Sequence, residues 1–313
     1  MQVLALASGI GAGRFLRGLV RVVPAEDVTV VGNTGDDIVM HGLHVSPDLD
    51  SVTYWLGDAF DRERGWGRRD ETFRATEELG RFDPDLAWFG LGDLDLATHL
   101  FRTHLLTGGA TLSEVTARVA GRFGVASRLL PMSDDPVTTR IDVLADGEEL
   151  DLHFQEYWVR RHARDEVKAV RYEGAPVARA APGVLEAIGD ADAIVLCPSN
   201  PVASLGPILA VPGIRETLAA RRTRAVGISG IVGGAPLAGM ADKLMPAAGV
   251  EVTAAGAAAC YAGLLVAWVI DEVDRSLEGR IAATGVRVGV TDTIMTDDRK
   301  AEALARTALA LLT

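Results

Sequence analysis

Four aspartates, Asp36, Asp37, Asp48 and Asp50, fall within a span of 15 residues. The first two close a polar loop after the apolar segment 28–31, and the other two open a helical run. Magnesium in proteins takes carboxylate oxygens together with substrate phosphates, so Asp36, Asp48 and Asp50 are the candidate ligands of a magnesium ion. For Asp48 or Asp50 taken alone, capping of the following helix is the alternative interpretation.

A glycine-rich segment, with Gly9, Gly11 and Gly13 followed by Arg14, lies between an expected strand over residues 1–7 and an expected helix. Backbone N–H groups where a strand passes into a helix favour a phosphate, and glycine lets the phosphate approach the backbone. The spacing differs from the dinucleotide fingerprint, because the third glycine comes one residue early. A tight turn that binds no ligand is the alternative.

Polar side chains also follow two other apolar strands. The second strand leads to Asn33, where a nicotinamide-binding fold would place an acid that meets the ribose. Ser199, Asn200 and Pro201 follow an expected strand over residues 193–197. Proline fixes the backbone there, and Ser199 and Asn200 would offer donors to a base or a phosphate, although a turn without a ligand is possible.

Two more residues are candidates for substrate contact: Trp66 and Asp93. Trp66 lies beside two arginines, so its ring could stack on an aromatic ligand or cover a local core. The segment 89–95 is expected to leave a strand and enter a helix, which makes Asp93 either a site residue or the cap of that helix.

The elements that must position these residues alternate between strand and helix, which predicts an α/β, Rossmann-like, mostly parallel sheet. Residues 1–56 and 167–313 are assigned to the nucleotide-binding core. Residues 57–166 are assigned to an inserted helical and β-hairpin subdomain, with a hairpin turning at Asp146-Gly147 and a capping box at Thr111 and Glu114.

Composition excludes several classes of function. The net charge of -12 repels polyanions, so nucleic acid is not an expected partner. The two cysteines have no metal-type spacing and the chain starts without a signal peptide pattern, which indicates a cytoplasmic protein. The apolar run 254–270 is expected to be a buried core helix rather than a membrane span.

Ten groups of residues together carry a resemblance to the 2-phospho-L-lactate transferase family of coenzyme F-420 biosynthesis, called phosphoenolpyruvate transferase in actinobacteria. They are Asn33–Asp37, Ser46–Asp50, Gly65–Gly67, Leu91–Asp93 with Ala97–His99, Leu130–Asp135, Phe154–Tyr157, Pro198–Pro201, Gly206–Leu209, Lys243–Met245 and Asp292–Met295. The resemblance spans nearly the whole chain.

The resemblance implies a dimeric magnesium-assisted transferase that takes a guanosine diphospho-type donor and the deazaflavin Fo. The ribityl hydroxyl of Fo attacks phosphorus, and GMP leaves. It also implies that Asp50 and Gly90 lie against Fo and that Asp36 and Asp48 lie near the metal. The glycine segment, with Ser199 and Asn200, would then face the donor.

Asp50 and Asp36 are the candidate catalytic residues, since a nearby carboxylate could orient the attacking hydroxyl. The sequence leaves open whether the transferred acid is lactyl or enolpyruvyl. A nicotinamide-dependent oxidoreductase and a regulatory protein that binds a nucleotide sugar without turnover are the rival interpretations.

Overall fold

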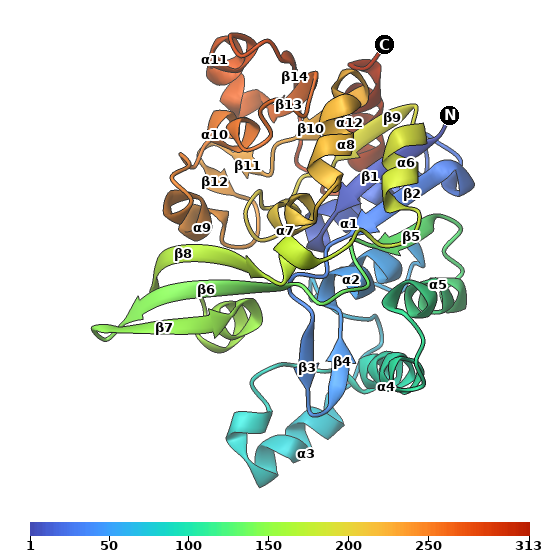
Figure 1. Ribbon diagram of the computed structural model, residues 1–313, viewed down its shortest axis with the longest axis vertical. Coiled ribbons are helices and arrows are strands. Elements are labelled where there is room, and N and C mark those ends of the chain that lie inside the picture. Colours follow the sequence, from blue (N-terminus) through green and yellow to red (C-terminus); the bar gives the residue numbers. More distant parts are fainter.

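The computed structural model describes residues 1–313, and a seven-stranded sheet forms its centre (Figure 1). All six strand pairings in this sheet are parallel. The predicted α/β fold with a mostly parallel sheet is therefore confirmed. In spatial order, the strands are β14 (Arg287–Thr291), β13 (Ala267–Asp271), β10 (Ala225–Ile228), β9 (Ala193–Leu196), β1 (Val3–Ala7), β2 (Val28–Gly32) and β5 (Arg128–Pro131).

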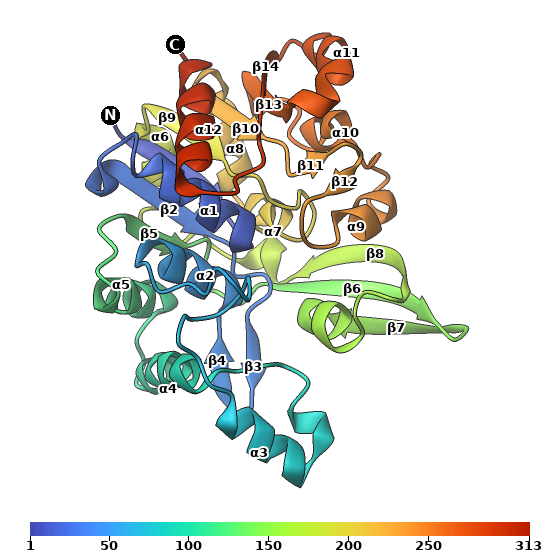
Figure 2. The same ribbon diagram turned by 180° about the vertical axis from the view of Figure 1, so that it is seen from behind.

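Helices cover both faces of this sheet, and the alternation of side chains along β1 reflects this. Leu4 and Leu6 belong to one apolar core, whereas Val3, Ala5 and Ala7 belong to the other. On the second face α1 and α12 lie side by side (Figure 2). The helices are α1 (Gly9–Leu19), α2 (Pro47–Leu56), α3 (Arg74–Phe82), α4 (Asp93–Thr107), α5 (Leu112–Arg122), α6 (Val184–Asp190), α7 (Leu205–Ala210), α8 (Ile214–Ala220), α9 (Ala241–Ala247), α10 (Ala254–Ala259), α11 (Glu278–Ala282) and α12 (Asp298–Ala310).

The order of strands creates a topological switch point between β1 and β9. From β1 the chain crosses through α1 to β2 on one side, whereas from β9 it passes through α7 and α8 to β10 on the other. In open α/β sheets, ligands bind in the crevice at the carboxyl ends of two such strands. The fold thus places a crevice beside the start of α1.

Two antiparallel sheets extend from the carboxyl side of the central sheet (Figure 1). One is the hairpin of β3 (Ile38–Met40) and β4 (Leu43–Val45). The other has the order β7 (Glu148–His153), β6 (Thr138–Ala145), β8 (Glu166–Glu173). A third, two-stranded sheet pairs β11 (Ile231–Val232) with β12 (Ala235–Pro236).

The division into a core and an insert over residues 57–166 remains a prediction. The central sheet nevertheless takes β5 from within that range, where it pairs with β2. The three-stranded sheet also continues beyond it, since β8 ends at Glu173.

Local predictions from the sequence had mixed outcomes. The hairpin turn at Asp146-Gly147 is confirmed, with both residues at positive φ, and Thr111 and Glu114 form the predicted capping box. The core helix predicted over 254–270 is wrong, because only its first part is helical and its end is the buried strand β13. No helix of the structure is long and apolar enough to cross a membrane.

A matched pair of glycine substitutions tests the packing of α1 on α12. A Cβ at Gly18 would overlap the backbone of Ala301, whereas a Cβ at Gly121, on the outside of α5, meets nothing within 4 Å. We expect Gly18→Ala to lower the free energy of unfolding by about 1–3 kcal/mol. Gly121→Ala should raise it by about 0.5–1 kcal/mol, because alanine favours the helix. Urea unfolding measures both, and equal effects of the two substitutions would contradict this packing.

Candidate active site

The side-chain amide of Asn33 joins two carboxylates at the crevice. Its nitrogen lies 2.9 Å from Oδ2 of Asp48 and 3.4 Å from Oδ1 of Asp36, so one amide group donates toward both acids. The same nitrogen is 3.4 Å from the carbonyl oxygen of Ala203, and Oδ1 of Asn33 accepts a 2.8 Å bond from the Gly35 amide. Asn33 therefore connects the loop after β2, the start of α2 and the segment after β9.

Both carboxylates of this pair are buried, with 5% of Asp36 and 7% of Asp48 exposed. Burial raises the pKa of Asp48 from its ordinary value to about 6, although hydrogen bonds from Ser8 and Asn33 lower it in part. Burial, and then the charges of Asp48 and Asp37, hold the pKa of Asp36 well above its usual range. Carboxyl groups with a raised pKa are frequent at functional sites, where burial and neighbouring like charges disfavour the ionised form.

Ser8 and Gln155, which were not among the residues predicted from the sequence, complete this cluster. Ser8 donates its hydroxyl to Asp48, and Gln155, just after β7, donates its amide to Asp36 over 3.0 Å. His153 also lies close, with Nε2 at 3.1 Å from the backbone oxygen of Asp37. The only sequence signal for Gln155 was its place in the group Phe154–Tyr157, which carried the resemblance without assigning a role.

Asp37 faces the β3–β4 hairpin instead of the pair. Its Oδ2 accepts from the Ser46 hydroxyl at 2.7 Å and lies 3.1 Å from Nε2 of His44. Burial raises the pKa of Asp37, and the hydrogen bond with His44 opposes that shift. This contact fixes the hairpin to the end of β2.

Asp50 pairs with Arg102 and does not join Asp36 and Asp48. Arg102 donates two nitrogens to the Asp50 carboxylate, one of them at 3.0 Å, and both side chains are buried. Residues two apart on a helix face different directions, which is why Asp48 and Asp50 of α2 separate. The structure contains no group of three or more His, Cys, Asp or Glu positioned to hold a metal ion. The three-carboxylate set predicted from the sequence is therefore not assembled.

A histidine and a second acid lie near the Asp50–Arg102 pair. Nδ1 of His99 lies 3.2 Å from Arg102, and burial lowers the pKa of His99 to about 4. On another side, Asp95 accepts from the Tyr54 hydroxyl, and burial, followed by the charge of Asp50, raises the pKa of Asp95 to about 7. Helices α2 and α4 are therefore joined here by buried polar contacts, Asp50 with Arg102 and Tyr54 with Asp95.

The glycine segment was expected to lie between the strand and the helix, but it forms the first turn of α1, which begins at Gly9. Packing explains two of its glycines: a Cβ at Gly11 would lie 2.5 Å from the Pro198 carbonyl oxygen, and one at Gly13 would overlap the ring of Trp55. Gly9 has a φ of +70° and lies beside Asp48.

Neighbouring predicted residues have identifiable contacts as well. The Arg14 guanidinium lies 5.8 Å from the centre of the Trp55 ring. The Ser199 hydroxyl donates to the Ser8 carbonyl oxygen at 3.0 Å, which joins the loop after β9 to the end of β1. Oδ1 of Asn200 accepts from the amides of residues 202 and 203 and shapes the turn that contains Pro201.

Three residues predicted to contact substrate, Trp66, Gly90 and Asp93, lie around α3 and α4. Trp66 is 43% exposed, and a Cβ at Gly90 would lie 3.2 Å from its ring, so the indole covers this glycine. Asp93 accepts from the backbone amides of Arg74 and Ala75 and thereby caps α3, not the helix that it begins. No strand precedes Gly90, contrary to the prediction.

A parallel α/β sheet with carboxylates, an amide and a helix start at its switch point defines a Rossmann-like protein with polar groups gathered where such folds bind ligands. The sequence profile of one family, described as "2-phospho-L-lactate transferase CofD", matches residues 3–307. The chain belongs to this family, and it is a transferase of coenzyme F-420 biosynthesis that moves a phospho-acid to Fo.

Individual relatives agree with this assignment. A protein of Streptomyces griseus named "Phosphoenolpyruvate transferase" is 52% identical over 312 residues, covering 99% of this chain and 98% of its own. A "2-phospho-L-lactate transferase" of Methanosarcina acetivorans is 40% identical over 303 residues, covering 97% and 96%. A crystal structure of a Bacillus halodurans protein superposes with a TM-score of 0.63 at 18% identity, covering 100% of this chain and 99% of that one, and supports the fold alone.

The pKa of Asp95 predicts a pH dependence of stability. An unfolded aspartate loses its proton near pH 4, whereas folded Asp95 keeps it to about pH 7. The folded state binds the extra proton in this window, so this group destabilises the fold progressively as pH rises from 4 to 7. We expect Asp95→Asn to become more stable, relative to the unmodified chain, across that window. Urea unfolding at pH 5 and pH 8 measures it, and a difference independent of pH would contradict the raised pKa.

Proposed function

We propose that the chain transfers a phospho-enolpyruvyl group from a guanosine diphospho-type donor to the ribityl hydroxyl of Fo. The hydroxyl oxygen forms a bond to phosphorus, the bond from that phosphorus to GMP breaks, and the hydroxyl proton is released. The observation that carries the proposal is the buried pair Asp36 and Asp48, bridged by Asn33, at the switch point beside α1.

The donor diphosphate is proposed to bind in this crevice. The start of α1, from Gly9, supplies backbone N–H groups and the positive end of the helix dipole. Ser199 and Asn200 border the crevice from the loop after β9. Asn33 in place of an acid favours this donor over a nicotinamide dinucleotide, whose ribose such an acid would bind.

Magnesium is the proposed cofactor, and the residues present fit it. Asp36 and Asp48 are buried carboxylates that repel one another, and a bound cation would relieve that repulsion. Magnesium takes one or two protein carboxylates as ligands together with phosphate oxygens. When bound, it would neutralise charge on the diphosphate and so favour departure of GMP. Asp36 and Asp48 would hold it, while Asn33, Ser8 and Gln155 orient these carboxylates.

Fo is proposed to bind on the side of α3 and α4, against Trp66, Gly90 and Asp50. The Asp50 carboxylate, held by Arg102, serves as a fixed acceptor that orients the attacking hydroxyl. In-line positioning supplies much of the acceleration in a phosphodiester exchange, and no covalent intermediate is needed.

The transferred acid, the cellular compartment and the oligomeric state are proposed as well. The enolpyruvyl acid is favoured over the lactyl acid, because relatives at 52% identity are named phosphoenolpyruvate transferases and the 2-phospho-L-lactate transferase is 40% identical. The protein is proposed to work in the cytoplasm, where its two free thiols persist, as a homodimer like the family that it resembles.

The proposed reaction can be tested through its two products, GMP and the heavier deazaflavin. With Fo, magnesium and the guanylylated enolpyruvyl donor, we expect one GMP per molecule of heavier deazaflavin, detected by mass spectrometry. The lactyl donor should react more slowly under the same conditions. Faster reaction of the lactyl donor would reverse the choice of acid, and absence of GMP with both donors would contradict the proposed reaction.

A single substitution tests the metal role of Asp36. Asp36→Asn removes one anionic ligand but keeps the acceptor for Gln155, so the magnesium concentration for half-maximal rate should rise about tenfold or more. Asp190→Asn is the control, because Asp190 is exposed on α6 and makes no side-chain hydrogen bond. An unchanged magnesium dependence in folded Asp36→Asn enzyme would remove Asp36 from the ligand set.

A further inference from the structure

The end of β7 lies where the three-stranded sheet meets the loop that carries Asp36. It leads into the group Phe154–Tyr157, which carried the family resemblance without an assigned role. β7 ends at His153, and a π-helix over Glu156–Arg160 follows. Single π-helical turns are rare and are frequent at functional sites. Gln155, between these two elements, is buried and donates to Asp36, so this segment reaches the proposed metal site.

The ring of His153, the last residue of β7, makes two hydrogen bonds. Its Nδ1 accepts from the backbone amide of Gln155 at 3.1 Å, and its Nε2 lies 3.1 Å from the Asp37 carbonyl oxygen. A backbone amide can only donate and a carbonyl oxygen can only accept, so both bonds require the neutral ring with its proton on Nε2. Burial lowers the pKa of His153, which favours this neutral form. His153 therefore connects Gln155 to the residue next to Asp36.

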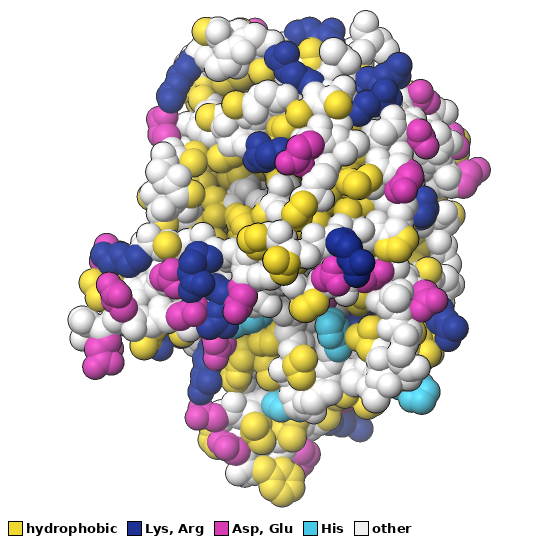
Figure 3. All heavy atoms as spheres, viewed as in Figure 1, with side chains coloured by type: hydrophobic (Ala, Val, Ile, Leu, Met, Phe, Trp, Pro, Cys, Tyr) yellow, Lys and Arg dark blue, Asp and Glu magenta, His cyan; other side chains and the backbone are white.

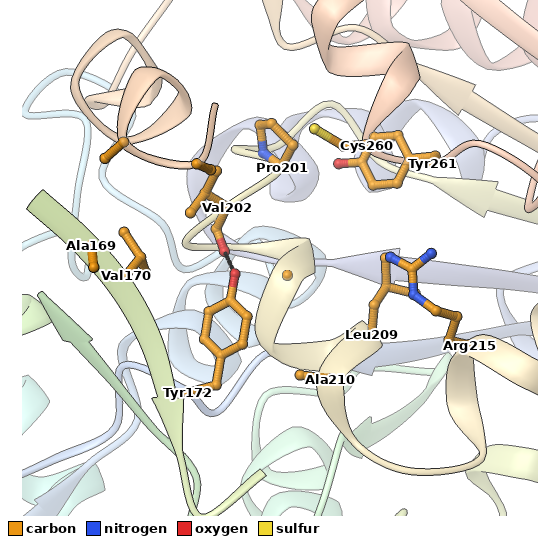
Figure 4. Close-up of a pocket in the computed structure, with 13 residues that line it drawn as sticks. Ala169, Val170, Tyr172, Pro201, Val202, Leu209, Ala210, Arg215, Cys260 and Tyr261 are labelled. Atoms are coloured by element: carbon orange, nitrogen blue, oxygen red, sulfur yellow. Dashed lines mark hydrogen bonds between the residues drawn. The ribbon is translucent and has the colours of Figure 1, made fainter. Parts of the chain in front are cut away.

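The three-stranded sheet is attached to two different loops of the crevice. Figure 3 shows histidine side chains, in cyan, at the surface where this sheet, on the left, joins the rest of the molecule. Through His153 the sheet contacts the loop after β2, at Asp37. Through Tyr172 of β8 it contacts the loop after β9, because the phenol donates to the Val202 carbonyl oxygen at 2.7 Å (Figure 4). Only the first contact is made beside Gln155, so substitutions can separate the two.

We propose that His153 is a positioning residue of the metal site, which holds Gln155 where its amide reaches Asp36. The inference rests on the proposed function, in which Asp36 is a magnesium ligand. The ring fixes the backbone at Gln155 on one side and the loop of Asp36 on the other. The distance between amide and carboxylate is thus set before a cation binds. Outer hydrogen bonds that orient a ligand in this way contribute to metal affinity.

Three substitutions at position 153 separate the two hydrogen bonds. His153→Leu removes both. His153→Asn keeps an acceptor for the amide two residues on, as in an Asx turn, and His153→Gln keeps a donor for the Asp37 carbonyl oxygen. Calorimetry of GDP binding with and without magnesium compares them. We expect the strengthening of GDP binding by magnesium to fall about 3- to 30-fold in His153→Leu and by less in the other two, while GDP affinity without magnesium changes by less than about twofold.

Two further variants show whether the effect belongs to this contact. Tyr172→Phe removes the other attachment of the sheet and should leave the strengthening by magnesium unchanged. His104→Leu is the matched histidine control, because His104 is exposed on α4 and makes no side-chain hydrogen bond, so it should behave as the unmodified chain. The inference is overturned if His153→Leu keeps the full effect of magnesium, or if Tyr172→Phe and His153→Leu lose it equally.

Hydrogen exchange in the metal-free protein, followed by NMR, separates this inference from the proposed function. The backbone amide of Gln155 should exchange about tenfold faster or more in His153→Leu, because its acceptor is lost, and at the unmodified rate in Tyr172→Phe. Equal exchange in the unmodified chain and in His153→Leu contradicts the inference whatever the function. If exchange rises as expected but the unmodified chain binds GDP equally without magnesium, the proposed metal role fails and the inference fails with it. Faster exchange together with a smaller effect of magnesium, in the position-153 variants alone, supports the positioning role.

Discussion

The structure at the switch point depends on keeping two carboxylates, Asp36 and Asp48, buried a few ångströms from one amide group. An unpaired buried charge is costly, so the side chains around this pair must supply its hydrogen bonds. They come from Ser8 after β1, Asn33 after β2 and Gln155 after β7. The central sheet and the antiparallel sheet must therefore meet at this point, and their junction is where the donor and the metal are proposed to bind.

The same principle organises the side of the molecule assigned to Fo. There the buried charge of Asp50 is compensated by Arg102 from α4, so α2 and α4 are joined by an ion pair rather than by apolar contact alone. Helices α3 and α4 in turn cap each other, since Asp93 accepts amides of α3 and Glu71 accepts amides of α4. Helices α3 and α4 are thus held together by polar interactions at their starts.

Short-range patterns in the sequence predicted what depends on neighbouring residues. The strand before Ser8, the turn at Asp146 and the capping box at Thr111 follow from local periodicity and backbone preference, and the structure has all three. Apolar content could not separate a strand from a helix within 254–270, since both are buried there.

Long-range contacts could not be read from the sequence in the same way. Gln155 is separated from Asp36 by 119 residues along the chain, and Arg102 from Asp50 by 52 residues. Hydrogen bonds between residues so far apart produce no local sequence pattern. Gly11 and Gly13 were predicted to let a phosphate approach the backbone, and this role stays a prediction. Their close contacts with Pro198 and Trp55 are a second reason for glycine, which only the fold reveals.

Asp36, Asp48 and the donor diphosphate repel one another, and we propose that one bound cation relieves this repulsion and holds the diphosphate at the two carboxylates. Calorimetric titration of GDP, with and without magnesium, tests it most directly, because the coupling between two ligands is reciprocal and can be measured from either side. We expect magnesium to strengthen GDP binding, GDP to strengthen magnesium binding by the same factor, and both effects to diminish in Asp48→Asn. Equally tight GDP binding in exhaustively demetallated protein would contradict it.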